Sequence, residues 1–126
     1  MSNEVRDDLK YTTSHEWVRV KGKQAVIGIT DHAQSELTDI VFVELPPVGK
    51  EVKKGEELCV VESVKSVSEV YAPVSGKVIA VNTRLDDAPE LINKSPYADG
   101  WIVELELKNP GDVLSLLDPA AYKKLS

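Results

Sequence analysis

The stretch VESVKSVSEV, residues 61–70, reads almost the same in both directions. Reflection about the bond between Lys65 and Ser66 matches valine with valine, serine with serine and glutamate with glutamate. Two matching strand-like arms around two central residues are typical of a tight antiparallel hairpin. In this mirror register Glu62 would face Glu69, and like charges directly opposite each other are destabilising. A shifted register or a bulge is therefore the open alternative.

Short strand-like segments surround this hairpin on both sides. Residues 15–30 carry two alternating runs around Gly22, which predicts another hairpin. A β-branched and aromatic run follows at residues 39–45, and a turn is expected at Lys54 and Gly55. In the segment 101–107 the apolar residues alternate with Glu104 and Glu106, the pattern of a strand with one buried face.

Helical signals are few and short. Thr30 or Asp31 can cap a two-turn helix, and residues 89–92 offer one helical turn within an irregular connection over 82–100. Near the C-terminus, Asp112 and Asp118 are candidate caps, and Pro119 suits a first helical position. We therefore predict one mainly β domain over residues 1–126, with a short inserted helix and C-terminal helices.

Composition excludes several classes of function. The 126 residues are 42% hydrophobic and 29% charged, with a formal net charge of −6 and no basic cluster, which disfavours nucleic-acid binding. No apolar run approaches the ~20 residues of a membrane span, and the N-terminal ten residues resemble neither a signal nor a transit peptide. The single Cys59, inside an apolar run, predicts a buried thiol in a reducing compartment.

Lys65 at the hairpin tip has two interpretations. A nucleophilic amine must be neutral, and the nearby carboxylates of Glu62 and Glu69 favour the charged ammonium form, which argues against covalent amine catalysis. A protruding lysine is accessible to a modifying enzyme, but turn tips also favour solvated polar residues of no special function. Spacing alone does not separate these two.

A family resemblance does separate them. The segment GEELCVVESVKSVSEVYAPVSGKVIAVN, residues 55–82, resembles the lipoyl-attachment segment of the glycine cleavage H-protein family. SHEWV, IGITDHAQ, VFVELPPVG and INKSPYADGW resemble the same family in the same order, so the likeness covers residues 10–125. It implies two small antiparallel sheets in a barrel-sandwich hybrid of the lipoyl/biotinyl-carrier type, with the modified lysine on a hairpin turn.

The resemblance also implies a function and partners. Lys65 would carry lipoic acid in amide linkage, and this swinging arm would shuttle an aminomethyl group between enzymes. The implied partners are the glycine decarboxylase (P protein), the tetrahydrofolate-dependent aminomethyltransferase (T protein), dihydrolipoamide dehydrogenase (L protein) and a lipoyl-attaching enzyme. We expect a carrier rather than an enzyme, and a monomer. We expect it in the bacterial cytoplasm, or in the mitochondrial matrix for a processed eukaryotic chain.

Three further residues acquire a role from the resemblance. Positions matching Ser14, Glu16 and Glu69 line a surface cleft in the family, where the loaded arm folds back. Many members have aspartate at the position of Glu69. Ser14 is expected on the same strand face as Glu16, two residues away. Ser14, His15 and Glu16 cannot form a catalytic triad on one strand, because consecutive side chains face opposite ways.

Other readings have weaker support. Neither His15 nor His32 has a partner at metal-ligand spacing, so no metal site is expected. A biotinyl carrier would have methionines beside its lysine, where Val64 and Ser66 stand. A hydrolase using Cys59 and a histidine conflicts with the apolar surroundings of Cys59. An H-like protein that chiefly passes lipoyl groups to other complexes fits the residues as well.

Overall fold

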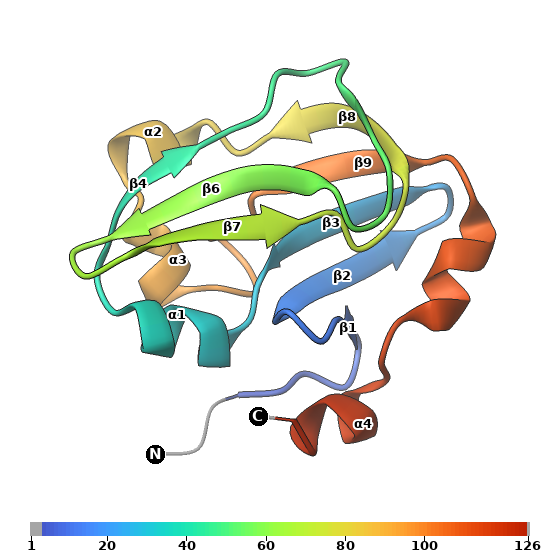
Figure 1. The fold of residues 1–126 in the computed structure, drawn as a ribbon, viewed down its shortest axis with the longest axis horizontal. Coiled ribbons are helices and arrows are strands. Elements are labelled where there is room, and N and C mark those ends of the chain that lie inside the picture. The colour runs from blue at the N-terminus through green and yellow to red at the C-terminus, as the bar shows by residue number, and fades with distance from the viewer. Residues whose placement is uncertain (1–3, 126) are drawn as a thin grey trace.

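A computed structural model describes residues 4–125 as two antiparallel sheets with short helices at their ends (Figure 1). Within that part of the chain, the larger sheet has six strands in the order β1-β2-β3-β9-β8-β5, and the smaller has the order β4-β6-β7. The strands are β1 Lys10–Tyr11, β2 Glu16–Lys21, β3 Gln24–Ile29, β4 Ile40–Glu44, β5 Glu51–Val52, β6 Glu57–Ser63, β7 Val67–Tyr71, β8 Gly76–Val81 and β9 Val103–Leu107. The predicted mainly β fold with two antiparallel sheets is confirmed.

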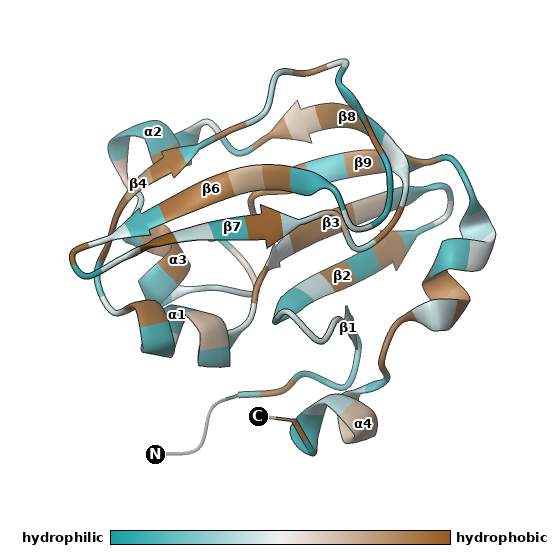
Figure 2. Ribbon diagram, viewed as in Figure 1, coloured by the Kyte–Doolittle hydropathy of each residue, from teal (hydrophilic) through white to brown (hydrophobic). Residues whose placement is uncertain are grey.

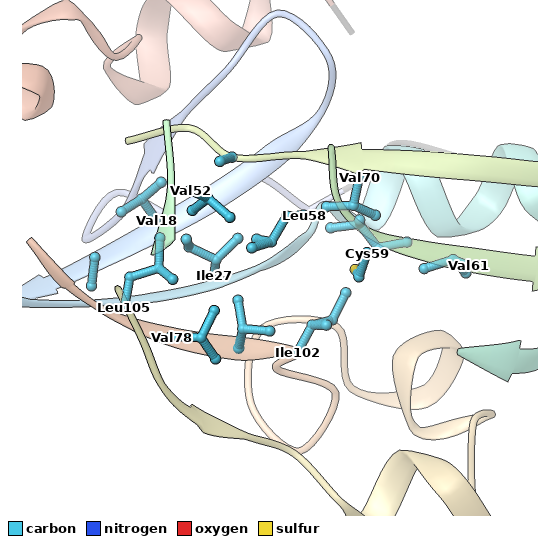
Figure 3. Packing of buried hydrophobic residues seen from close by; sticks show 14 of the residues in the cluster. Val18, Ile27, Val52, Leu58, Cys59, Val61, Val70, Val78, Ile102 and Leu105 are labelled. Carbon is cyan, nitrogen blue, oxygen red and sulfur yellow. The ribbon is translucent and has the colours of Figure 1, made fainter. Parts of the chain in front are cut away.

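The core lies between the two sheets. Figure 3 shows side chains of the larger sheet, such as Ile27 and Leu105, packed toward Leu58, Val61 and Val70 of the smaller sheet, all of them buried. Burial of these faces supplies the main driving force for folding. The sheets therefore form one packed sandwich, and the β6–β7 hairpin is held by its inner face.

The alternation predicted for residues 101–107 is confirmed in β9. Val103, Leu105 and Leu107 are buried, Glu106 is exposed and Glu104 is half-buried. The hairpin predicted around Gly22 is also present, since Lys21 pairs with Gln24 and Gly22 has a φ of 59°. Glycine adopts this left-handed conformation without a steric penalty.

The mirror register predicted for the β6–β7 hairpin is wrong. Glu62 pairs with Val67, and Val60 pairs with Glu69, and the three residues 64–66 connect the two strands. A shift of two residues leaves the same side chains on the same faces, because strand side chains alternate with period two. It also removes the direct juxtaposition of Glu62 and Glu69, which relieves their repulsion.

The helices are α1 Asp31–Leu37, α2 Arg84–Asp87, α3 Leu91–Lys94, the 3₁₀ helix η1 Pro110–Ser115 and α4 Pro119–Lys123. Thr30 caps α1, and Asp118 caps α4, with Pro119 at the first position as predicted. Asp112 is not a cap. Asn109 caps η1 instead, and Asp112 accepts a hydrogen bond from the backbone N–H of Ser75.

None of the helices among residues 4–125 is long and apolar enough to cross a membrane.

Candidate functional site

Lys65 lies at the far tip of the β6–β7 hairpin, which projects beyond the body of the sandwich (Figure 1). Its side chain is exposed, as are those of Val64, Ser66 and Val67. Within residues 4–125, Lys65 Nζ has no hydrogen-bond or ion-pair partner among the protein's own groups. The amine is therefore free to be approached by another molecule.

Ser63 closes the turn that presents Lys65. Its hydroxyl accepts the backbone N–H groups of Lys65 at 3.3 Å and Ser66 at 3.1 Å, and donates to the carbonyl of Ser66 at 3.2 Å. The Ser63 N–H donates to the same carbonyl at 2.8 Å. A serine hydroxyl that bonds the following backbone in this way stabilises a turn locally. The backbone around Lys65 is thus ordered, although its side chain is exposed.

Glu16 is a buried carboxylate at the start of β2. It is 1% exposed, and its Oε1 accepts hydrogen bonds from Thr12 Oγ1 at 2.5 Å and Ser14 Oγ at 2.6 Å. Among residues 4–125, its Oε2 accepts only the backbone N–H of Tyr71, at 3.3 Å. A buried charge persists only when hydrogen bonds replace its lost hydration, and these donors do so. A carboxylate offers about four acceptor positions, so Oε2 retains capacity for another donor.

The segment 12–15 that supplies these donors is a turn, and the expectation that Ser14 lies on the strand with Glu16 is wrong. The N–H of Thr12 donates to the carbonyl of Glu16 at 3.0 Å, and that of His15 donates to the carbonyl of Thr12 at 3.2 Å. His15 has a φ of 69°, which reverses the chain direction before β2. The turn folds Ser14 back onto Glu16, which strand alternation could not foresee.

A cleft of about 300 Å³ lies beside Glu16, between the 14–16 segment, α1 and β7. Ser14, Glu16 and Glu69, the three residues expected at a cleft, all line it. Apolar side chains including Ile29, Leu37 and Val61 form the rest of the wall, with Glu36 as a further acid. Because β7 is the strand that leads away from the Lys65 turn, the cleft is next to the hairpin.

His15 and His32, which have no partner at metal-ligand spacing in the sequence, also line this cleft. The rings of His15 and His32 lie 4.5 Å apart between centroids, and His15 Nδ1 is 2.7 Å from the hydroxyl of Tyr122. Burial, and secondarily the neighbouring His32, lowers the pKa of His15 below its usual 6.5. Burial thus favours the uncharged form of His15 in this cleft, where Glu16, Glu36 and Glu69 are the acidic groups.

Glu69 lies at the rim of the cleft on the edge strand β7. It is exposed and accepts a hydrogen bond from the hydroxyl of Tyr71 at 2.6 Å, a bond that raises the pKa of Tyr71. The cleft thus combines a buried carboxylate, an exposed carboxylate and an apolar wall. This combination suits a cation carried at the end of a mostly apolar chain.

No group of three or more His, Cys, Asp and Glu side chains in residues 4–125 is arranged to hold a metal ion. Ser14, His15 and Glu16 all line one cleft, although alternation along a strand would have placed them on opposite faces. They do not form a catalytic triad, because Ser14 hydrogen-bonds Glu16 whereas His15 hydrogen-bonds Tyr122. Burial raises the pKa of Cys59 to about 12, which leaves it an unreactive thiol.

An exposed lysine on an ordered hairpin turn of a two-sheet sandwich is the arrangement expected of a carrier domain of the lipoyl or biotinyl type. The model of the glycine cleavage H-protein family matches residues 9–126. The chain belongs to that family, and the resemblance seen in its sequence is confirmed.

Named relatives agree with this assignment. The glycine cleavage system H protein of Symbiobacterium thermophilum is 58% identical over 118 residues, which are 94% of this chain and 92% of the relative. That of Thermotoga maritima is 52% identical over 115 residues, 91% of this chain and 93% of the relative. The crystal structure of a glycine cleavage system H protein from Mycobacterium marinum superposes with a TM-score of 0.88 at 37% identity, covering 95% of this chain and 97% of that one.

Proposed function

We propose that this chain is the lipoyl carrier of a glycine cleavage system, with the lipoyl group attached to Lys65. Family membership supports the carrier role. The position of Lys65 is the observation that supports it as the attachment residue. Its amine has no partner among residues 4–125, and it projects from a turn ordered by Ser63. Lys65 gives up a proton to become an amine and attacks an activated lipoyl carboxyl. The amide bond forms, the leaving group departs, and a second proton is released.

A bound lipoyl group would supply sulfur chemistry, both redox and group transfer, whereas the protein supplies position and recognition. The ordered turn holds the attachment point, and the freely extended lysine side chain lets the arm reach different partners, which raises the local concentration of its reactive end. We propose that the partners are the glycine decarboxylase, the aminomethyltransferase, dihydrolipoamide dehydrogenase and a lipoyl-attaching enzyme. The chain itself is then a substrate of these enzymes rather than an enzyme.

We propose that the cleft beside Glu16 holds the end of the loaded arm. An aminomethyl group is a cationic amine, and it is lost by hydrolysis when water reaches it. Glu16 has an oxygen with spare acceptor capacity, Glu69 adds a second negative charge, and Ser14 orients Glu16 by a 2.6 Å hydrogen bond. A charge-assisted hydrogen bond in a partly dry cleft is stronger than one in open solvent.

The remaining parts of the proposal concern organisation. We propose that residues 1–126 act as one domain and as a monomer. Cys59 is buried and unpaired, which supports a reducing compartment such as the bacterial cytoplasm as the place of action.

Replacement of the attachment residue tests the proposed function. Lys65→Arg keeps the positive charge but cannot form the amide, so it should fold normally and lose all glycine-dependent carbon dioxide exchange with the glycine decarboxylase. Lys77→Arg is the matched control, because Lys77 is also exposed but lies on β8 in the other sheet. Full exchange activity in Lys65→Arg would refute the choice of Lys65. No exchange by the lipoylated wild type would refute the carrier role.

A further inference from the structure

Exposed hydrophobic side chains gather around the Lys65 turn. Val64 and Val67 are each 64% exposed, and Val41 and Phe42 on the neighbouring strand β4 are 50% and 49% exposed. Figure 2 shows hydrophobic residues along β4 and at the tip of the β6–β7 hairpin. Exposed apolar side chains gathered in one region of a small protein are typical of an interaction surface. These four residues are called the tip patch.

Strand pairing puts two residues of the tip patch in one row. Phe42, Glu62 and Val67 pair in one row across β4, β6 and β7. The adjacent residues along the strands, such as Val43 and Val61, are buried against the core. Because side chains alternate between the two faces of a sheet, the row that contains Phe42 faces outward. A register shift between Ile40 and Phe42 places Val41 as an extra residue in β4, which is how two consecutive residues become exposed there.

The tip patch has a fixed position relative to Lys65. The backbone N–H of Val64, the residue before Lys65, donates to the carbonyl of Asp39 at 3.0 Å. This bond ties the turn to the beginning of β4, beside Val41 and Phe42. A partner that contacts β4 would therefore meet Lys65 at a defined place.

The face around the tip patch is negatively charged. Strands β4, β6 and β7 contain four glutamates, Glu44, Glu57, Glu62 and Glu69, and no lysine or arginine. Glu44 and Glu69 share a row two residues along the strands from that of Phe42, on either side of Val60. Exposed apolar side chains with glutamates between and beside them are complementary to a partner whose apolar contact site also carries basic residues.

We propose that the tip patch is the docking surface for the enzyme that attaches the lipoyl group, and that this enzyme presents an apolar site that also carries basic side chains. The inference rests on the proposed attachment at Lys65. Phe42 is the central contact, since buried aromatic anchors dominate interface energies.

The length of the lysine side chain selects this occupant. The attaching enzyme acts on bare Lys65, whose four-carbon stem forces the enzyme against the turn and the adjacent β4. Enzymes that act on the end of a completed arm work farther from the turn. The attachment step therefore depends on the tip patch more than the later steps do.

The test compares substitutions of exposed apolar residues in the unmodified protein. Phe42→Ser should lower kcat/KM for lipoyl attachment about tenfold or more, because loss of a central aromatic contact weakens binding of a partner by about tenfold or more. Phe42→Leu should retain most of the rate. Val48→Ser is the matched control, since Val48 is 63% exposed in the loop between β4 and β5, outside the tip patch. Attachment is followed by intact mass, and folding by urea unfolding of each variant.

A second readout identifies the occupant. Each variant is loaded to completion with excess attaching enzyme and assayed with the dehydrogenase, the decarboxylase and the aminomethyltransferase. Slow attachment of Phe42→Ser with these later steps within about twofold of wild type supports the proposal. Equal attachment rates for Phe42→Ser and Val48→Ser, or a defect confined to a later step, would overturn it. If wild type itself takes no lipoyl group at Lys65, the proposed function fails rather than this inference.

Discussion

Replacing Glu16 by glutamine removes one negative charge from the cleft with little change in shape. The glutamine carbonyl can still accept the hydroxyls of Thr12 and Ser14, which bond Glu16 Oε1 at 2.5 and 2.6 Å. The amide nitrogen then faces the backbone N–H of Tyr71, whose bond to Oε2 is already long at 3.3 Å. We therefore expect Glu16→Gln to fold, with a modest loss of stability of about 1 kcal/mol.

The effect on a cationic cargo should be larger than the effect on folding. A hydrogen bond to a charged partner contributes about 1.5–3 kcal/mol. Because ~1.4 kcal/mol corresponds to a factor of ten in an equilibrium constant, the arm should leave the cleft roughly tenfold to hundredfold more often. If hydrolysis occurs only when the arm is outside the cleft, the aminomethyl group should be lost faster by the same factor.

The assay loads the lipoylated protein with glycine and its decarboxylase, isolates it, and follows ammonia release without a folate acceptor. Glu106→Gln is the control, since Glu106 is an exposed carboxylate on β9, outside the cleft. Reoxidation of the empty arm by the dehydrogenase should be unchanged in both variants, because the empty arm carries no cation. Equal decay rates for the loaded wild type and Glu16→Gln would refute the role assigned to Glu16.

Two further predictions concern the turn and the cleft wall. Ser63→Ala removes the hydroxyl that bonds the backbone of Lys65 and Ser66, so it should lower the free energy of unfolding in urea by about 1–2 kcal/mol and slow lipoyl attachment. Ser66→Ala, the control, should change both quantities little. A normal attachment rate for Ser63→Ala would contradict this prediction. The lowered pKa of His15 means that the unfolded chain binds its proton more readily, so the stabilising contribution of neutral His15 is lost as pH falls. Between about pH 7 and about pH 5 the wild type should lose more stability to unfolding than His15→Asn does. Asparagine is chosen because it tolerates the positive φ at this position. Parallel pH profiles of stability for the two proteins would contradict the prediction.

The sequence predicted the parts of the fold that depend on local patterns. Alternation in residues 103–107 and the glycine at position 22 depend on side-chain period and backbone sterics, which a single segment contains. The register of the β6–β7 hairpin depends on a choice between two pairings that bury the same faces. The observed pairing separates Glu62 from Glu69 and lets the Ser63 hydroxyl bond the turn, and the mirror symmetry gave no sign of the second effect.

The residues of the candidate site could be predicted from the sequence better than their arrangement in space. Ser14, Glu16 and Glu69 came from a family resemblance, and they do line one cleft. The burial of Glu16 and the part played by Thr12 depend on the turn over residues 12–15, where His15 has positive φ. Non-glycine residues rarely adopt that conformation, so propensity alone favoured an extended strand. His32 enters the cleft from α1, a contact between segments that no local pattern encodes.

Peptide mapping by mass spectrometry of the protein purified from its native host tests the attachment of the lipoyl group to Lys65 directly. We predict one lipoyl group per chain, in amide linkage to Nζ of Lys65, in the peptide that contains residues 61–70. A chain that carries the lipoyl group on another lysine, or that carries none while its host cleaves glycine, would contradict it.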